Sequence, residues 1–121
     1  MSHPVSVLEM SPEEVRQALL RKQIILVDVR EPQEYGTERI HGALLYPLST
    51  FDPAFLPSDA DKQVVFHCAG GMRSLTAATR KLAVDGKAAH MKGGINGWKA
   101  AGLPTVRVDP ATGQVIDTPA M

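Results

Sequence analysis

Residues 64–74 read VVFHCAGGMRS, and this stretch decides the fold. The apolar run from Val64 to His67 is typical of a buried strand, and Ser74 to Val84 have the spacing of an amphipathic helix. A short loop with two glycines joins them. A strand, a glycine loop and a helix N-terminus in this order direct backbone N–H groups towards one point. That point holds Cys68, the only cysteine of the chain, so we expect its reactive thiolate form to be favoured.

The rest of the chain alternates short apolar runs with amphipathic stretches. The expected strands are 5–8, 24–29, 43–46, 64–67 and 88–91. The expected helical segments begin at Ser11, at Pro32, at Ser74 and at Gly94, and the prolines within 47–62 predict a loop with short helical pieces. This alternation predicts an α/β fold with a mainly parallel sheet.

Several helix ends carry clear signals. Ser11 and Glu14 can form a capping box, and Gly86 is placed to end the helix that begins at Ser74. In that helix we expect four side chains to face the sheet: Leu75, Ala77, Ala78 and Leu82.

We expect one domain over residues 1–121, with a core from about residue 5 to residue 104. The tail, 105–121, holds a hairpin candidate, in which Val106 and Val108 precede a turn and Val115 and Ile116 follow it.

The composition is ordinary for a globular protein, with 44% hydrophobic and 21% charged residues and a formal net charge of zero. The charge balance argues against nucleic acid as a partner, and no apolar run approaches the roughly 20 residues that cross a bilayer. The first residues show no basic patch before an apolar stretch, so we expect no signal peptide. A lone cysteine suits a reducing compartment, most simply the cytoplasm. One cysteine with four scattered histidines argues against a structural zinc site.

Three segments with unusual residues follow expected strands: Asp28–Glu31, the loop Cys68–Arg73, and Lys92–Gly94. Because the carboxyl ends of parallel strands form the edge at which sites lie, we expect these segments to converge on one site.

At this point the sequence resembles a known family, the single-domain rhodaneses, which are thiosulfate-type sulfurtransferases. The resemblance runs over roughly residues 5–104. It is carried by four segments, which are specific together: DVRE with EY (28–31, 34–35), IHGA (40–43), CAGGMRS (68–74) and GGINGW (93–98).

The resemblance implies a three-layer α/β/α fold with a central, mainly parallel five-stranded sheet. It also implies that Cys68 takes sulfane sulfur from a donor such as thiosulfate, becomes a persulfide and passes the sulfur to cyanide, a thiol or a protein acceptor. The implied partners are therefore small molecules and a sulfur-accepting protein, with no cofactor and no metal.

The chemistry of the residues and the family resemblance together predict a role for each residue of the expected site. Cys68 is the nucleophile, and Arg73 is a cation that stabilises charge and binds the donor. Backbone N–H groups from Ala69 to Arg73 form the anion cradle, in which we expect Gly70 and Gly71 to adopt positive φ, while Met72 is a candidate wall for the acceptor's approach.

The supporting residues are expected to act through structure. Asp28 matches an aspartate that holds neighbouring loops in members of the family. Arg30 can pair with Asp28 or with Glu34, or it can reach the anionic donor. Ser74 can cap the helix or bond the loop.

We expect the histidines to be structural. His67 points away from Cys68, since neighbours on a strand face opposite sides, and it is expected to be partly buried and hydrogen-bonded. His41 and His90 have no partners at metal-ligand spacing.

Two other functions stay open. A phosphatase or arsenate reductase of the same fold would have five residues between cysteine and arginine, whereas four separate Cys68 from Arg73. In rhodanese-fold enzymes the longer loop holds phosphate or arsenate, and the shorter one suits a single persulfide sulfur. The other alternative is a non-catalytic sulfur-carrier or interaction module.

Overall fold

The computed structural model describes residues 6–118 and shows a five-stranded sheet in the order β1-β6-β5-β2-β4. All four neighbouring pairs in this sheet are parallel. The strands are β1 (Leu8–Met10), β2 (Ile24–Asp28), β4 (Leu44–Leu45), β5 (Gln63–His67) and β6 (Ala89–Met91). The expected α/β class and the parallel five-stranded sheet are confirmed.

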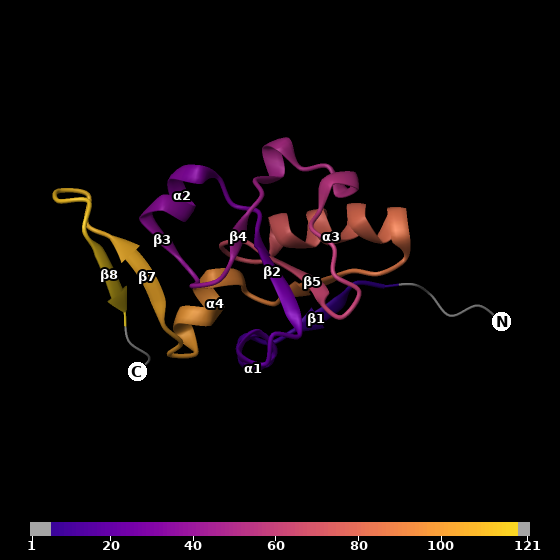
Figure 1. Ribbon diagram of the computed structural model, residues 1–121, viewed down its shortest axis with the longest axis horizontal. Coiled ribbons are helices and arrows are strands. Elements are labelled where there is room, and N and C mark those ends of the chain that lie inside the picture. The colour runs from indigo at the N-terminus through magenta and orange to yellow at the C-terminus, as the bar shows by residue number, and fades with distance from the viewer. Residues whose placement is uncertain (1–5, 119–121) are drawn as a thin grey trace.

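Helices cover both faces of this sheet (Figure 1). One face carries α3 (Met72–Asp85) and the 3-10 turns η1 (Leu48–Thr50) and η2 (Pro53–Phe55). The other face carries α1 (Pro12–Leu20) and α4 (Gly94–Ala100). A further short helix, α2 (Pro32–Thr37), follows β2.

Alternation along the strands divides the core into two layers, since successive side chains point to opposite faces. In β5, Val65 packs with the residues of α1 and α4, whereas Val64 and Phe66 pack with those of α3. Cys68 continues the second series and lies in the α3 layer. The strand therefore delivers the thiol to the side on which α3 begins.

Local signals set the helix ends. Ser11 and Glu14 form the expected capping box, with Ser11 Oγ accepting from the Glu14 N–H at 3.2 Å. Gly86 ends α3 in the left-handed conformation, with φ of +77°. Both predictions are confirmed.

The first strand was misplaced by the sequence prediction. It spans Leu8–Met10 instead of residues 5–8, of which Val5 lies outside the described residues. β1 is an edge strand, and its position is decided by its register on β6, in which Leu8 pairs with Ala89 and Met10 with Met91.

The phase of α3 also differs. The helix begins at Met72, and its fully buried positions are Ser74, Ala77 and Ala78, at the spacing i, i+3, i+4. Leu75 is thereby turned outwards and is 43% exposed, so its expected orientation towards the sheet is wrong.

The expected hairpin is present, but it belongs to a second sheet. β7 (Thr105–Val108) pairs antiparallel with β8 (Val115–Thr118) and also with β3 (Glu38–Arg39), a two-residue strand absent from the prediction. This small sheet lies beside the main one, next to α2 (Figure 1). No helix within residues 6–118 is long and apolar enough to cross a membrane.

Candidate active site

Cys68 follows β5 directly and lies at the N-terminus of α3, with 1% of its surface exposed. The backbone N–H of Gly71 donates to its Sγ at 3.1 Å, and that of Ser74 at 3.3 Å. Two N–H donors and the positive end of a fourteen-residue helix all favour negative charge on this sulfur. Of the N–H groups expected from Ala69 to Arg73, that of Gly71 donates to the sulfur, and the second donor, Ser74, lies one residue beyond the expected range.

One glycine of the loop is required by its conformation. Gly71 is the N-cap of α3 and has φ of +111°, which side-chain-bearing residues rarely adopt. Gly70 does not have a positive φ, and a Cβ added there would meet open space. The expectation that both glycines curl the loop is confirmed for Gly71 and wrong for Gly70.

The Lys92–Gly94 segment closes the loop from the side of α4. Ile95 N–H donates to the carbonyl oxygen of Cys68 at 2.8 Å, and Asn96 N–H donates to that of Ala69 at 3.1 Å. These bonds need a close approach, because a Cβ on Gly94 would lie 2.5 Å from the Ala69 oxygen. Gly93 and Gly94 thus allow α4 to hold the backbone of the loop that carries Cys68.

Arg73 is bound by a partner that the sequence analysis did not assign to it. Its Nη1 and Nη2 donate to the two carboxylate oxygens of Glu34 in α2 at 2.7 and 3.0 Å. This pair lowers the pKa of Glu34 to about 2, with the Arg73 hydrogen bond as the main cause. The pKa of Arg73 is raised, mainly by Glu34 and also by the negative charges of Cys68 and Asp28.

This pairing reduces the positive charge that Arg73 presents to an anionic donor. The guanidinium is about one-third exposed, and its charge is balanced by a bidentate carboxylate. Because the two partners lie 39 positions apart in the sequence, no local pattern could have revealed the pair.

Asp28 and Arg30 form a buried pair at the end of β2. Arg30 Nε and Nη2 donate to the Asp28 carboxylate at 2.8 to 3.1 Å, and Nη2 also donates to the Glu38 carbonyl oxygen at 2.6 Å. Of the three partners considered for Arg30, the structure selects Asp28. The pair joins the end of β2 to β3 of the small sheet.

His67 is buried on the face opposite Cys68, beside Asp28 in the register of β5 on β2. Burial lowers its pKa, against the opposing effect of the Asp28 carboxylate. Its Nε2 lies 3.5 Å from Asp28 Oδ2 and has no hydrogen-bond partner among residues 6–118. Its Nδ1 lies 3.3 Å from the Cys68 carbonyl oxygen, so the expected hydrogen bond is present at one ring nitrogen. The side chain is fully buried, where a partly buried one was expected, and its orientation away from Cys68 fits the alternation of the strand.

Ser74 bonds the loop and does not cap the helix, since Gly71 occupies the N-cap position. Its Oγ lies 3.1 Å from the Gly71 carbonyl oxygen and 3.6 Å from Cys68 Sγ. It also lies 3.0 Å from His90 Nδ1, a contact that sequence reasoning missed. Met72 is 82% exposed, as a side chain at the mouth of the loop would be.

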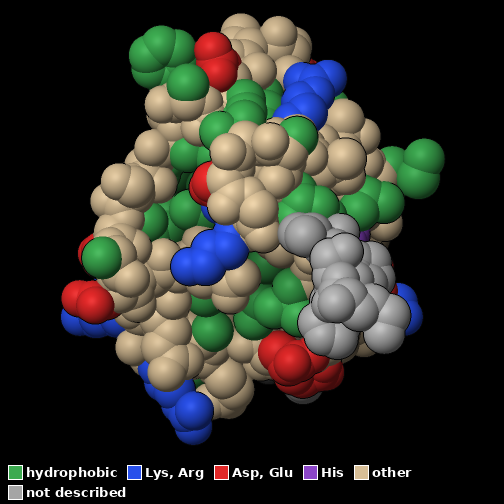
Figure 2. Space-filling model, turned by 90° about the vertical axis from the view of Figure 1, so that its right-hand side faces the viewer, with side chains coloured by type: hydrophobic (Ala, Val, Ile, Leu, Met, Phe, Trp, Pro, Cys, Tyr) green, Lys and Arg blue, Asp and Glu red, His purple; other side chains and the backbone are tan. Residues whose placement is uncertain are grey.

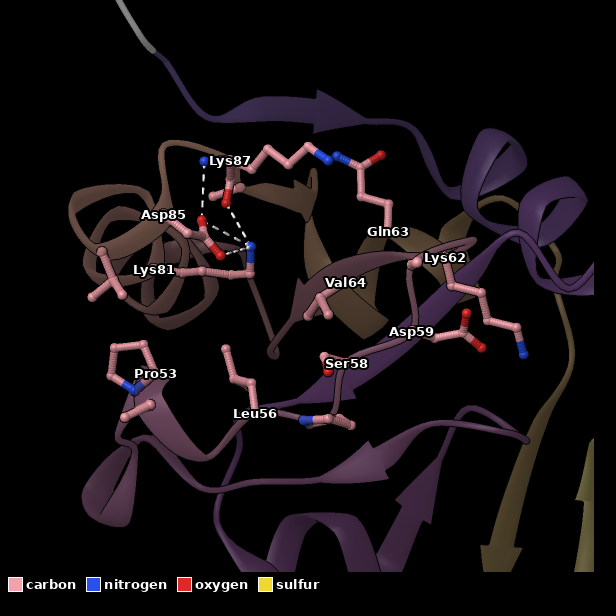
Figure 3. A pocket seen from close by; sticks show the side chains of 15 residues that line it. Pro53, Leu56, Ser58, Asp59, Lys62, Gln63, Val64, Lys81, Asp85 and Lys87 are labelled. Carbon is pink, nitrogen blue, oxygen red and sulfur yellow. Dashed lines mark hydrogen bonds and ion pairs between the residues drawn. The ribbon is translucent and has the colours of Figure 1, made fainter.

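No group of three or more His, Cys, Asp or Glu side chains within residues 6–118 is arranged to hold a metal ion. A hollow of about 620 Å³ lies away from Cys68. It lies near the end of α3, between η2 and the start of β5 (Figure 3). Lys81 in its wall is already paired with Asp85 and the Lys87 carbonyl oxygen.

Figure 2 shows the end of the molecule at which α3 ends, with acidic and basic side chains interspersed among apolar ones.

Comparison with known proteins gives a consistent result. A family model described as the rhodanese-like domain matches residues 11–101. An uncharacterized Synechocystis protein, slr1261, is 40% identical over 103 residues, which are 84% of this chain and 57% of that protein. A sulfurtransferase from Allochromatium vinosum is 31% identical over 102 residues, which are 83% of this chain and 95% of that protein. The chain thus spans little more than half of the Synechocystis protein.

Solved structures agree on the fold. A thiosulfate sulfurtransferase from Pseudomonas aeruginosa matches with a TM-score of 0.70 and 26% identity, covering 95% of this chain and 21% of that one. A protein from Rhodopseudomonas palustris, described as a possible tyrosine phosphatase, matches with a TM-score of 0.65 and 25% identity, covering 79% and 82%.

Proposed function

The chain belongs to the rhodanese-like domain family, and we propose on that premise that it is a sulfurtransferase with the Cys68 thiol as its nucleophile. The donor is a sulfane-sulfur compound such as thiosulfate, and the acceptor is cyanide, a small thiol or a protein thiol. The observation that carries the proposal is the position of Sγ, within 3.1 and 3.3 Å of the N–H groups of Gly71 and Ser74. These donors stabilise an anionic sulfur at the start of α3.

In the first half-reaction the Cys68 thiolate attacks the outer sulfur of the donor. A sulfur–sulfur bond forms to Cys68, and the donor's own sulfur–sulfur bond breaks. Its electron pair leaves with the remainder of the donor, which is sulfite when the donor is thiosulfate. In the second half-reaction the acceptor attacks the outer sulfur of the persulfide and Cys68 regains its thiolate.

The surrounding residues have distinct roles in this proposal. Backbone N–H groups in the loop stabilise the anionic persulfide. Arg73, whose charge is balanced by Glu34, fixes the loop against α2 and supplies a moderate attraction for an anionic donor. Asp28 and Arg30 support the adjacent end of β2.

The test is the mass of the intact protein with and without thiosulfate. We expect a gain of one sulfur atom, about 32 Da, that is lost on adding cyanide. Cys68→Ser should show no gain. An adduct that survives this substitution, or no adduct on the folded wild-type protein, would refute the proposal.

A phosphatase is the second candidate, because the Rhodopseudomonas palustris protein shares the fold. Four residues between Cys68 and Arg73 make a smaller ring of N–H groups than the five of a phosphatase loop. Turnover of an aryl phosphate that depends on Cys68 would favour this candidate over sulfur transfer.

A further inference from the structure

A chain of polar side chains leads from the candidate nucleophile to the surface. Cys68 Sγ lies 3.6 Å from Ser74 Oγ, Ser74 Oγ lies 3.0 Å from His90 Nδ1, and His90 Nε2 lies 3.3 Å from Glu9 Oε2. The first three side chains are buried, whereas the side chain of Glu9 is 57% exposed. This series of side chains therefore joins a buried thiol to a solvent-exposed carboxylate.

The register of the sheet brings these residues together. In the parallel pairs, Glu9 of β1 lies beside His90 of β6, and His90 lies beside Phe66 of β5. Cys68 is two positions beyond Phe66 and so faces the same side of the sheet. The first turn of α3 then places Ser74 over this side.

The donors and acceptors in this chain can be assigned in one direction. Glu9 offers an acceptor, so a neutral His90 carries its proton on Nε2 and leaves Nδ1 as an acceptor. The Ser74 hydroxyl then donates to Nδ1, and its oxygen accepts from the Cys68 thiol. The Gly71 carbonyl oxygen, 3.1 Å from Ser74 Oγ, is a competing acceptor for the same hydroxyl proton.

The same heavy-atom positions also suit the reversed direction. When His90 carries protons on both nitrogens, Nδ1–H donates to Ser74 and the Ser74 hydroxyl donates to the Cys68 thiolate. Every contact is a hydrogen bond in both states, so the proton can move without rearrangement of the side chains.

We propose that Ser74, His90 and Glu9 form a proton relay that takes up the thiol proton of Cys68. The S–H bond breaks as that proton binds Ser74 Oγ, and the original Ser74 hydroxyl proton binds His90 Nδ1. The products are a thiolate and an imidazolium that faces the Glu9 carboxylate. The step involves no oxidation, and in the catalytic cycle it rests on the proposed sulfur transfer.

The relay draws its members from neighbouring elements of the fold. Among residues 6–118, the side chains hydrogen-bonded to His90 are Glu9 from β1 and Ser74 from α3, and Cys68, in the loop after β5, lies beyond Ser74. Arg73, in the same turn of α3, is bound by Glu34.

The first test needs no substitution. Nitrogen-15 NMR of the wild-type histidine side chains distinguishes the two neutral tautomers. We expect His90 to carry its proton on Nε2. A neutral His90 with its proton on Nδ1 could not accept from Ser74 and would overturn the relay.

The second test follows the ultraviolet absorbance of the thiolate against pH, with Cys68→Ser as the blank. His90→Asn keeps a hydrogen-bonding group but takes up no proton. We expect it to shift the thiolate transition towards higher pH by about one unit, equivalent to a tenfold change in the equilibrium constant. His41→Asn, at an exposed histidine outside the relay, should leave the transition in place. Superimposed curves for His90→Asn and wild type would overturn the proposal.

Because His90 is buried, Glu9→Gln serves as the variant that retains the fold. Its shift should have the same direction and be smaller, because exposed ion pairs are weak. Glu13→Gln, an exposed carboxylate on α1, is the matched control. Equal curves for these two variants would exclude Glu9 from the relay. These readouts are independent of thiosulfate, so an absent sulfur adduct would refute the proposed function and leave the relay to its own test.

Discussion

At the scale of single residues, two glycines shape the site for different reasons. Gly71 adopts a positive φ at the start of α3, and Gly94 allows α4 to approach the carbonyl oxygens of Cys68 and Ala69. Neither reason concerns the thiol itself. Both concern the backbone that carries it, so the geometry around Cys68 depends on residues that have no side chain.

The substitution Gly94→Ala tests the close approach. Its Cβ would collide with backbone oxygens of the loop, and its φ of +59° is unfavourable for alanine. We expect a loss of stability above about 2 kcal/mol, with slowed formation of the sulfur adduct. Denaturant unfolding and adduct mass measure both. Gly36→Ala is the control, since a Cβ there meets open space, and equal behaviour of the two variants would contradict this account.

At the scale of elements, the Glu34–Arg73 pair joins α2 to α3. It connects the segment after β2 with the first turn of the helix that positions Cys68. From the sequence, Glu34 is expected near the site only as one of the possible partners of Arg30. Arg73 was expected to be a free cation, and in the structure it forms an ion pair with Glu34.

This pair predicts a pH dependence of stability. The folded pKa of Glu34, about 2, lies below its ordinary value of 4.5, so the pair stabilises the fold fully above pH 4.5. That contribution is lost as the pH falls from about 4.5 to about 2. Over this range we expect the melting temperature of wild type to fall further than that of Glu34→Gln. Glu13→Gln should follow the wild-type curve, and parallel curves for Glu34→Gln and wild type would contradict the prediction.

At the scale of the whole molecule, the small sheet β3-β7-β8 is attached to the main domain through Glu38. Its carboxylate accepts from Thr105 at 2.6 Å and from Lys99 at 2.9 Å, and its carbonyl oxygen accepts from Arg30. The pKa of Glu38 is lowered: burial alone would raise it, but the hydrogen bonds from Thr105 and Lys99 outweigh burial.

The attachment can be weakened without touching the site. Thr105→Val removes a hydrogen bond at a buried position and should cost about 1 kcal/mol of unfolding free energy. Formation of the Cys68 adduct should stay unchanged, because the Thr105 side chain bonds Glu38 within the small sheet. Urea unfolding and adduct mass test the two parts. A slowed adduct would show that the small sheet supports the site.

The sequence by itself determined the α/β class, the capping box at Ser11, the end of α3 at Gly86 and the strand–loop–helix setting of Cys68. These features depend on alternation, helical spacing and turn chemistry, which are local along the chain. The count of four residues between Cys68 and Arg73 is local as well.

Only the tertiary structure decided the pairing of Arg73 with Glu34, the contact between Ser74 and His90, the position of β1 and the role of β3. Each depends on strand register or on the phase of a helix, which bring together residues far apart in the chain. The exposure of Leu75 also follows from helix phase, because the orientation of α3 that buries Ser74 beside Cys68 turns Leu75 towards solvent. Local patterns thus located the candidate nucleophile, and packing decided which groups surround it.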